Sequence, residues 1–204
     1  KHKREADIEK LTGTYQSDSA MYRMFRGIEA VRKGNEGEAL EHFAVAVGLE
    51  PDNVLLLRTV GAVVLRRRGY GIAIICYNKL CELLPDVKAY AINQCLCLAA
   101  TGDTKTAVNK AYELNLNNES DNQVKRLLAW VLICNGNAEK ALNIYDELMA
   151  TDKQPDDALN IAYAQWINGN PGEAKNSFTE WLINHPGANL EHEFKNDDYV
   201  FNLN

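Results

Sequence analysis

The stretch Gly34–Asn53, GNEGEALEHFAVAVGLEPDN, places an alanine, Ala39, four residues before an aromatic residue, Phe43, and ends in a proline-containing turn. The same alanine returns along the chain at steps of 34, 34, 34 and 33 residues, as Ala73, Ala107, Ala141 and Ala174. A period of between roughly 20 and 50 residues indicates an array of stacked structural repeats. The sequence therefore predicts five copies of one unit.

Two further positions keep the same step. Every unit has a small residue twelve positions before its alanine, and four of the five have an aromatic residue four positions after it. The small residues are Gly27, Gly61, Cys95, Ala129 and Ala162, and the residues after the alanine are Phe43, Tyr77, Ala111, Tyr145 and Phe178. Proline follows the alanine by twelve positions at Pro51, Pro85 and Pro186. In this pattern the chain resembles the tetratricopeptide-repeat (TPR) family, although the tryptophan of the family signature is absent from every unit.

The resemblance implies an all-α fold, a right-handed α-solenoid of stacked antiparallel helix pairs in a TPR-like superhelix. The predicted units are 20–53, 54–87, 88–121, 122–155 and 155–188. Residues 1–19 are expected to form a polar lead-in, with Ser17–Ser19 offering helix N-caps. Residues 189–204 are expected to form a C-terminal cap or tail.

The second unit supports this fold from its residues alone. Two helical stretches, separated by a glycine-containing turn, each carry an apolar face at helical spacing. The first face comprises Leu57, Val60, Gly61 and Val64, and the second comprises Ala73, Tyr77 and Leu80. Pro85 is expected to end the second helix. A single pair cannot bury its apolar faces alone, so neighbouring pairs must stack.

Composition excludes several classes of protein. The chain has 204 residues, is 46% hydrophobic and carries a net charge of −6, which argues against a general nucleic-acid binder. No apolar run reaches the roughly 18 residues of a membrane span, so direct membrane insertion is not expected. The five cysteines form no disulfide-like framework, which predicts a reducing, cytoplasmic location. The first residue is Lys1, and we expect the native start to have been removed.

No motif argues for an enzyme, and the sequence predicts no catalytic, cofactor-binding or metal-binding residue. Cys95 and Cys97 are two positions apart, which on a helix points them about 200° apart, so we interpret them as buried core residues. His185 and His192 lack the spacing of a metal site. The acidic pairs 156–157 and 197–198 are expected to be helix caps or solvated loops.

In TPR arrays the first helices of the pairs line a concave groove, and four positions of each usually face a ligand peptide. Carried over to this sequence, the resemblance predicts the groove residues Met24, Ile28, Arg58, Leu65, Ile92, Leu96, Arg126, Trp130, Tyr163 and Trp166. Such a mostly apolar surface suits a peptide or helix of a partner protein. The alternative is that some of these side chains pack between repeats. Met24 and Ile28 stand where the TPR clamp for acidic chaperone tails needs lysine and asparagine.

The predicted function is that of a protein–protein interaction scaffold or adaptor, with a co-chaperone-like role as one form of it. The alternative is a non-catalytic TPR module cut from a larger enzyme or a membrane-associated assembly. Charge is uneven, with 14 Lys/Arg and 12 Asp/Glu in residues 1–88 but 8 and 16 in residues 89–204. The run Arg66–Arg68 is either a solvated helix end or a patch for an acidic partner.

The C-terminal tail carries four apolar residues within five positions, Tyr199, Val200, Phe201 and Leu203. An apolar terminus of this kind is expected to find a surface. The tail either packs as a cap over Phe178 and Trp181, or occupies a groove of its own or of a neighbouring molecule, or is disordered. Occupancy of a neighbour's groove predicts self-association.

Overall fold

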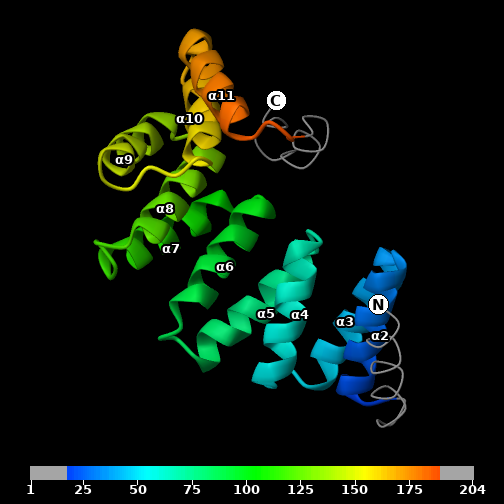
Figure 1. Ribbon diagram of the computed structural model, residues 1–204. Coiled ribbons are helices and arrows are strands. Elements are labelled where there is room, and N and C mark those ends of the chain that lie inside the picture. The colour runs from blue at the N-terminus through cyan, green and yellow to red at the C-terminus, as the bar shows by residue number, and fades with distance from the viewer. Residues whose placement is uncertain (1–17, 189–204) are drawn as a thin grey trace. The chain divides into compact units, whose positions relative to one another are not determined.

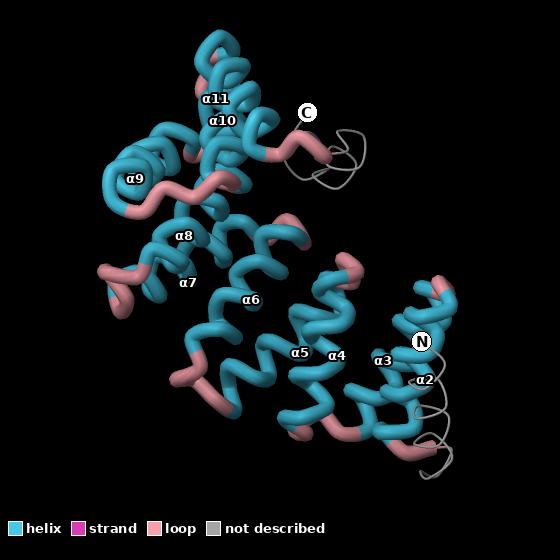
Figure 2. The backbone as a smooth tube through the Cα atoms, in the orientation of Figure 1, coloured by secondary structure: helices cyan, strands magenta, loops and turns pink. Residues whose placement is uncertain are grey.

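The computed structural model describes residues 18–188 of the chain, and in that range it contains ten α-helices and no strand (Figures 1 and 2). The helices fall into two compact units that divide between Cys97 and Leu98, inside α6 (Lys88–Ala100). Residues 1–17 of the predicted N-terminal lead-in lie outside the described residues. The whole of the predicted C-terminal cap or tail, residues 189–204, lies outside them as well.

The first unit contains two helix pairs and most of α6. Helix α2 (Ala20–Lys33) packs against α3 (Glu36–Leu49), and α4 (Val54–Arg66) packs against α5 (Tyr70–Leu83). Helix α4 also contacts α2 and α3, so the second pair stacks on the first (Figure 1). The side-chain amide of Gln94 on α6 donates a hydrogen bond of 2.7 Å to Asn78 Oδ1 on α5.

The second unit begins at the end of α6 and continues with α7 (Thr104–Leu116). Helix α8 (Asn122–Cys134) packs against α9 (Ala138–Thr151), and α10 (Asp157–Ile167) packs against α11 (Pro171–Asn184). Helix α10 also lies on α8 and α9. The predicted all-α fold of consecutive packed helix pairs is confirmed, whereas the boundaries of the five units stay a prediction.

Several helix ends follow from local sequence. Ser19 is the N-cap of α2, and its Oγ accepts a hydrogen bond of 3.1 Å from the backbone N–H of Tyr22. Pro171 is the first residue of α11, where its missing N–H is not needed. Helix α5 ends at Leu83, two residues before Pro85. The cap at Ser19 and the helix end before Pro85 were predicted, and both are confirmed.

One turn position repeats with the period of the sequence. Between the first and second helices of a pair, the backbone φ is positive at Gly34, Gly102, Gly136 and Gly169, with values of 83°, 88°, 77° and 82°. In the repeat 54–87 the corresponding residue is Arg68, with a φ of 61°. Because a Cβ atom is disfavoured in this region, Arg68 is held in a strained conformation.

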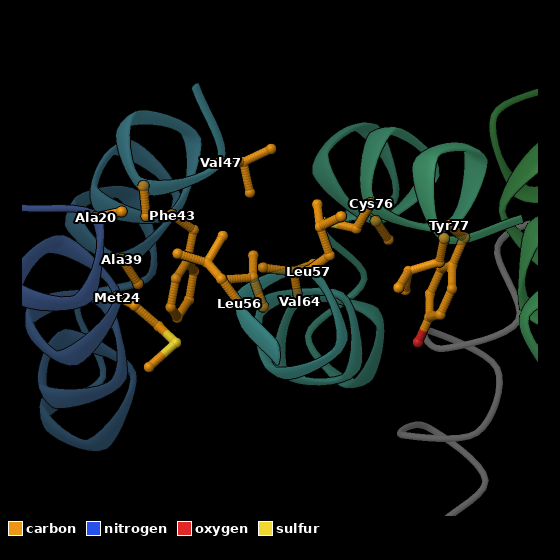
Figure 3. Packing of buried hydrophobic residues seen from close by; sticks show 14 of the residues in the cluster. Ala20, Met24, Ala39, Phe43, Val47, Leu56, Leu57, Val64, Cys76 and Tyr77 are labelled. Atoms are coloured by element: carbon orange, nitrogen blue, oxygen red, sulfur yellow. The ribbon is translucent and has the colours of Figure 1, made fainter. Parts of the chain in front are cut away.

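The repeated small and aromatic residues meet inside the first two helix pairs, as Gly27 with Phe43 and Gly61 with Tyr77. A Cβ atom added to Gly27 on α2 would lie 2.5 Å from the ring of Phe43 on α3, so only glycine allows this approach. Phe43 is completely buried, and Figure 3 shows it beside Met24, facing Leu56 of α4. The predicted core residues of the second repeat, including Leu57, are buried as expected.

Candidate functional site

The predicted groove residues differ widely in exposure. Arg58 and Trp166 are exposed, whereas Met24, Ile92 and Tyr163 are 4%, 8% and 7% exposed. The remaining five, Ile28, Leu65, Leu96, Arg126 and Trp130, are half-buried. Packing inside the helix array therefore accounts for Met24, Ile92 and Tyr163, in line with the alternative left open by the sequence. The groove as a whole stays a prediction.

Helix α4 presents a largely exposed stripe opposite its core side, in which Leu65 is half-buried. The stripe, called the α4 face below, consists of Leu55, Arg58, Ala62, Leu65 and Arg66. The spacing of these residues places them on one side of the helix, while Leu56, Val60 and Val64 on the other side are fully or almost fully buried. Leu55 is 61% exposed. The helix thus has apolar side chains both in the core and at its surface.

The α4 face also carries positive charge that its neighbours do not neutralise. Arg58 and Arg66 are exposed, and neither makes an ion pair or hydrogen bond with the part of the chain that the structure describes. Arg67, next in sequence, pairs with Glu36 of α3 at 3.4 Å. The face therefore combines exposed aliphatic surface with two guanidinium groups available to an acidic group.

Arg126, on α8, is engaged by two carboxylates. Its Nε and Nη2 donate hydrogen bonds of 2.8 and 2.9 Å to the two oxygens of Asp157, and its Nη1 donates one of 2.8 Å to Asp152 Oδ2. Nη2 also donates to the backbone carbonyl of Asp152. Asp157 accepts a further hydrogen bond of 3.0 Å from the N–H of Gln154. The network joins α8, the loop after α9 and the start of α10.

The electrostatics of this network follow from its hydrogen bonds. The bonds to Asp157 and then to Asp152 raise the pKa of Arg126 well above its ordinary value. In return, the hydrogen bond from Arg126 lowers the pKa of Asp152. Arg126 is thus held in place by its neighbours, so its predicted contact with a partner has to compete with these bonds.

Asp157 differs from the expectation of a cap or solvated loop. Asp156 is solvated, with 84% of its side chain exposed, but the side chain of Asp157 is 2% exposed. The missed signal lies in the repeat register. The third position of the other units holds Tyr22, Leu56, Tyr90 and Val124. An aspartate at a position otherwise aromatic or aliphatic indicates a buried charge that needs a cation nearby.

An apolar cavity of about 350 Å³, called the α10–α11 slot below, lies between the last two described helices. Its walls include Ala162, Tyr163, Trp166, Ala174, Lys175 and Phe178. Trp166 is 63% exposed. Tyr163 and Trp166 were predicted to face a ligand, whereas the contribution of α11 to a binding surface was not predicted.

The cysteines have the features of core residues. Cys95 and Cys97 are 1% and 0% exposed, so the prediction that they are buried is confirmed. Burial raises the pKa of the Cys76, Cys97 and Cys134 thiols to about 12. In residues 18–188, no group of three or more His, Cys, Asp or Glu side chains is arranged to hold a metal ion. Helices of the length and apolar character needed to cross a membrane are likewise absent from that range.

Comparison with known proteins gives a uniform result for the fold. No protein-family model and no curated protein matches the sequence. Among solved structures, TTC0263, a thermophilic TPR protein of Thermus thermophilus, is 15% identical and covers 90% of this chain and 100% of its own, with a TM-score of 0.60. YrrB, a TPR protein with an unusual peptide-binding site, is 15% identical and covers 93% and 97%, with a TM-score of 0.54.

A third similar structure is MamA of Desulfovibrio magneticus RS-1, at 16% identity, coverage of 81% and 94%, and a TM-score of 0.57. The chain has a tetratricopeptide-repeat fold. The α4 face lies in the first compact unit of this fold and the α10–α11 slot in the second.

Proposed function

We propose that this chain is a non-catalytic protein-interaction module whose α4 face binds a segment of a partner protein carrying both apolar and acidic side chains. The observation that carries the proposal is the exposure of Leu55 beside Arg58 on a helix whose opposite side is core. An interaction scaffold or adaptor needs a surface of this kind and no reactive group.

The α4 face offers two sources of binding free energy. Covering a leucine side chain contributes about 1.5–3 kcal/mol when burial is complete, and Leu55 is largely available for it. Arg58 and Arg66 each present a planar donor fork that matches a carboxylate. A partner segment in which acidic and aliphatic residues alternate can pair with the arginines and cover the leucines at the same time. A purely polyanionic ligand would pair with the arginines but leave Leu55 and Leu65 in contact with water.

The fold of the chain makes peptide binding a reasonable hypothesis by analogy. YrrB, a TPR protein of similar extent, has an unusual peptide-binding site. The co-chaperone-like role stays a prediction, as does the alternative of a module cut from a larger enzyme or a membrane-associated assembly.

The test is selection of ligands from a random peptide display library on the intact chain, followed by affinity measurement on the selected peptides. We expect the selected sequences to be enriched in aspartate or glutamate next to leucine-like residues. Arg58→Glu is expected to weaken binding at least about tenfold, because it replaces attraction by repulsion at a contact. Leu55→Ser is expected to weaken it by a similar factor.

The matched control is Ile75→Ser, which removes an aliphatic side chain that is 55% exposed on α5 and lies outside the α4 face. Circular dichroism verifies that all three variants are folded. Equal affinity of Arg58→Glu and the parent for every selected peptide, or an equal loss in Ile75→Ser, contradicts the proposal.

A further inference from the structure

A helix that stacks on a preceding pair buries residues of that pair. In the second unit, Ala129, Ile133 and Tyr145 of the α8–α9 pair are at most 1% exposed, and α10 packs on that pair. In the first unit the corresponding pair, α2 and α3, is contacted by α4, and its Phe43 is fully buried. The first helix of one pair thus covers the face of the pair before it.

Two of these three positions are more exposed in the α10–α11 pair, whereas Ala162, the counterpart of Ala129, is buried. Moving 33 residues along the chain from Ile133 leads to Trp166, whose exposure is 63% against 1% for Ile133. Phe178 corresponds in the same way to Tyr145 and is half-buried. Among the described residues no further helix lies on this face, and the α10–α11 slot of about 350 Å³ is found there.

We propose that the α10–α11 slot binds an amphipathic helix of a partner protein, which docks on α10 and α11 as α10 docks on α8 and α9. The slot is walled by three aromatic side chains and by alanines that let a helix approach closely. This is the surface that helix-in-groove recognition requires. The site lies in the other compact unit from the α4 face and does not depend on the proposed function.

The chemistry of the bound helix follows from one difference between the two docking faces. On α8, Arg126 pairs with Asp157 of the docked α10. The residue of α10 at the position of Arg126 is Leu159. An acidic residue at the matching place in the bound helix would lack this cation on α10 and would be costly to bury, since the lysine of the slot wall, Lys175, is an exposed residue of α11. The partner helix therefore carries an uninterrupted apolar stripe, as α4 does with Leu56 and Val60.

Two other sources of this helix fit the slot less well. Continuing the repeat register beyond residue 188 puts Glu191, Lys195 and Asn196 where α4 has Leu56, Val60 and Gly61. The first helix of a second copy, α2, has Tyr22 and Arg26 at the first two of these positions, and Arg26 pairs with Glu29 at 2.8 Å. Neither sequence offers an uninterrupted apolar stripe, which favours a helix from a different protein.

The probe is a fluorescein-labelled peptide with the sequence of residues 53–67, in which Leu55→Lys aids solubility and a hydrocarbon staple on the exposed side maintains the helix. This peptide has the apolar stripe of α4. The control peptide differs only by Leu56→Asp. Anisotropy is measured with the intact chain. The proposal predicts that the first peptide binds and that the control binds at least about tenfold more weakly, because an unpaired carboxylate is then buried.

Variants of the protein locate the site. Trp166→Asp is expected to weaken binding of the apolar peptide at least about tenfold, since it places a charge inside the slot. Ile183→Asp adds the same charge at a residue of α11 that is 74% exposed and outside the slot, and it should leave affinity unchanged. Because both side chains are largely exposed, both variants are expected to fold, which circular dichroism checks.

Four outcomes overturn the proposal. The first is failure of the intact chain to bind the apolar peptide. The second is loss of binding in Arg58→Glu but not in Trp166→Asp. That result would show that the peptide binds the α4 face, and it would not contradict the proposed function. The third is binding only after residues 189–204 are deleted, which makes the chain's own segment the occupant. The fourth is concentration-dependent self-association, measured by sedimentation, that Trp166→Asp abolishes.

Discussion

Replacing Arg126 by methionine removes the cation that holds the buried carboxylate of Asp157. Breaking a buried ion pair on one side typically costs about 3–5 kcal/mol, because the remaining charge stays desolvated. Here the N–H of Gln154 still donates a hydrogen bond of 3.0 Å to Asp157, so one contact remains. We therefore expect the lower end of that range, a loss of about 3 kcal/mol in the free energy of unfolding.

The assay is urea denaturation followed by circular dichroism, together with hydrogen exchange of the α10 amides. For a chain of this size, a loss of about 3 kcal/mol lowers the Tm by about 6–12 °C. Exchange should increase first in α10, because the network anchors its start. The matched control is Lys125→Met, the preceding residue, which loses a 3.2 Å ion pair to a largely exposed Glu147. That change should cost no more than about 0.5 kcal/mol.

A second substitution, at Asp157, separates the loss of the ion pair from any effect of the new methionine side chain. In Arg126→Met/Asp157→Leu the buried carboxylate is gone, and Asp152, which also loses Arg126, is 36% exposed, so we expect the double variant to recover at least half of the lost stability. The reasoning is refuted if Arg126→Met costs less than about 1 kcal/mol. It is also refuted if the double variant is no more stable than Arg126→Met, since the cycle then shows no coupling.

Gly27→Ala should destabilise the chain by about 1–3 kcal/mol in urea, because its Cβ would lie 2.5 Å from the Phe43 ring; Gly61→Ala, with a nearest contact of 3.2 Å, should cost less, and equal losses would contradict this packing. Arg68→Gly should stabilise the chain by about 0.5–1 kcal/mol by relieving a positive φ, and a drop in Tm would show that the side chain of Arg68 contributes more than the strain costs. The folded pKa of Asp152 lies below its ordinary value of 3.8, so its contribution to stability is complete above that pH and is lost as the pH falls through the folded pKa. The difference in unfolding free energy between the parent and Asp152→Asn should accordingly be constant at neutral pH and shrink in acid, and a difference that grows in acid would reverse the assignment. Because burial raises the pKa of the Cys76, Cys97 and Cys134 thiols to about 12, a thiol-specific reagent at about pH 8 should label them only as fast as the protein opens, as peptide mapping of the labelled chain would show.

The candidate surfaces were partly predictable. The repeat register selected Arg58 on α4 and Trp166 on α10, and both are exposed, while their role in binding stays a prediction. The same reasoning selected Met24 and Tyr163, which are buried. Periodicity shows on which side of a helix a residue lies. Whether that side is exposed or buried depends on whether another helix packs on it.

The helix pairs, their small and aromatic contact positions, and several of their caps were determined by the sequence itself. The reason is that helical periodicity, capping and proline placement act over a few residues and recur every 33 or 34 residues. Only the tertiary structure decided that Asp157 is paired with Arg126, 31 residues away, and that Trp166 is open where Ile133 is covered. Residues at equivalent repeat positions differ in burial because burial depends on a neighbouring helix, and a local pattern does not encode that neighbour's presence.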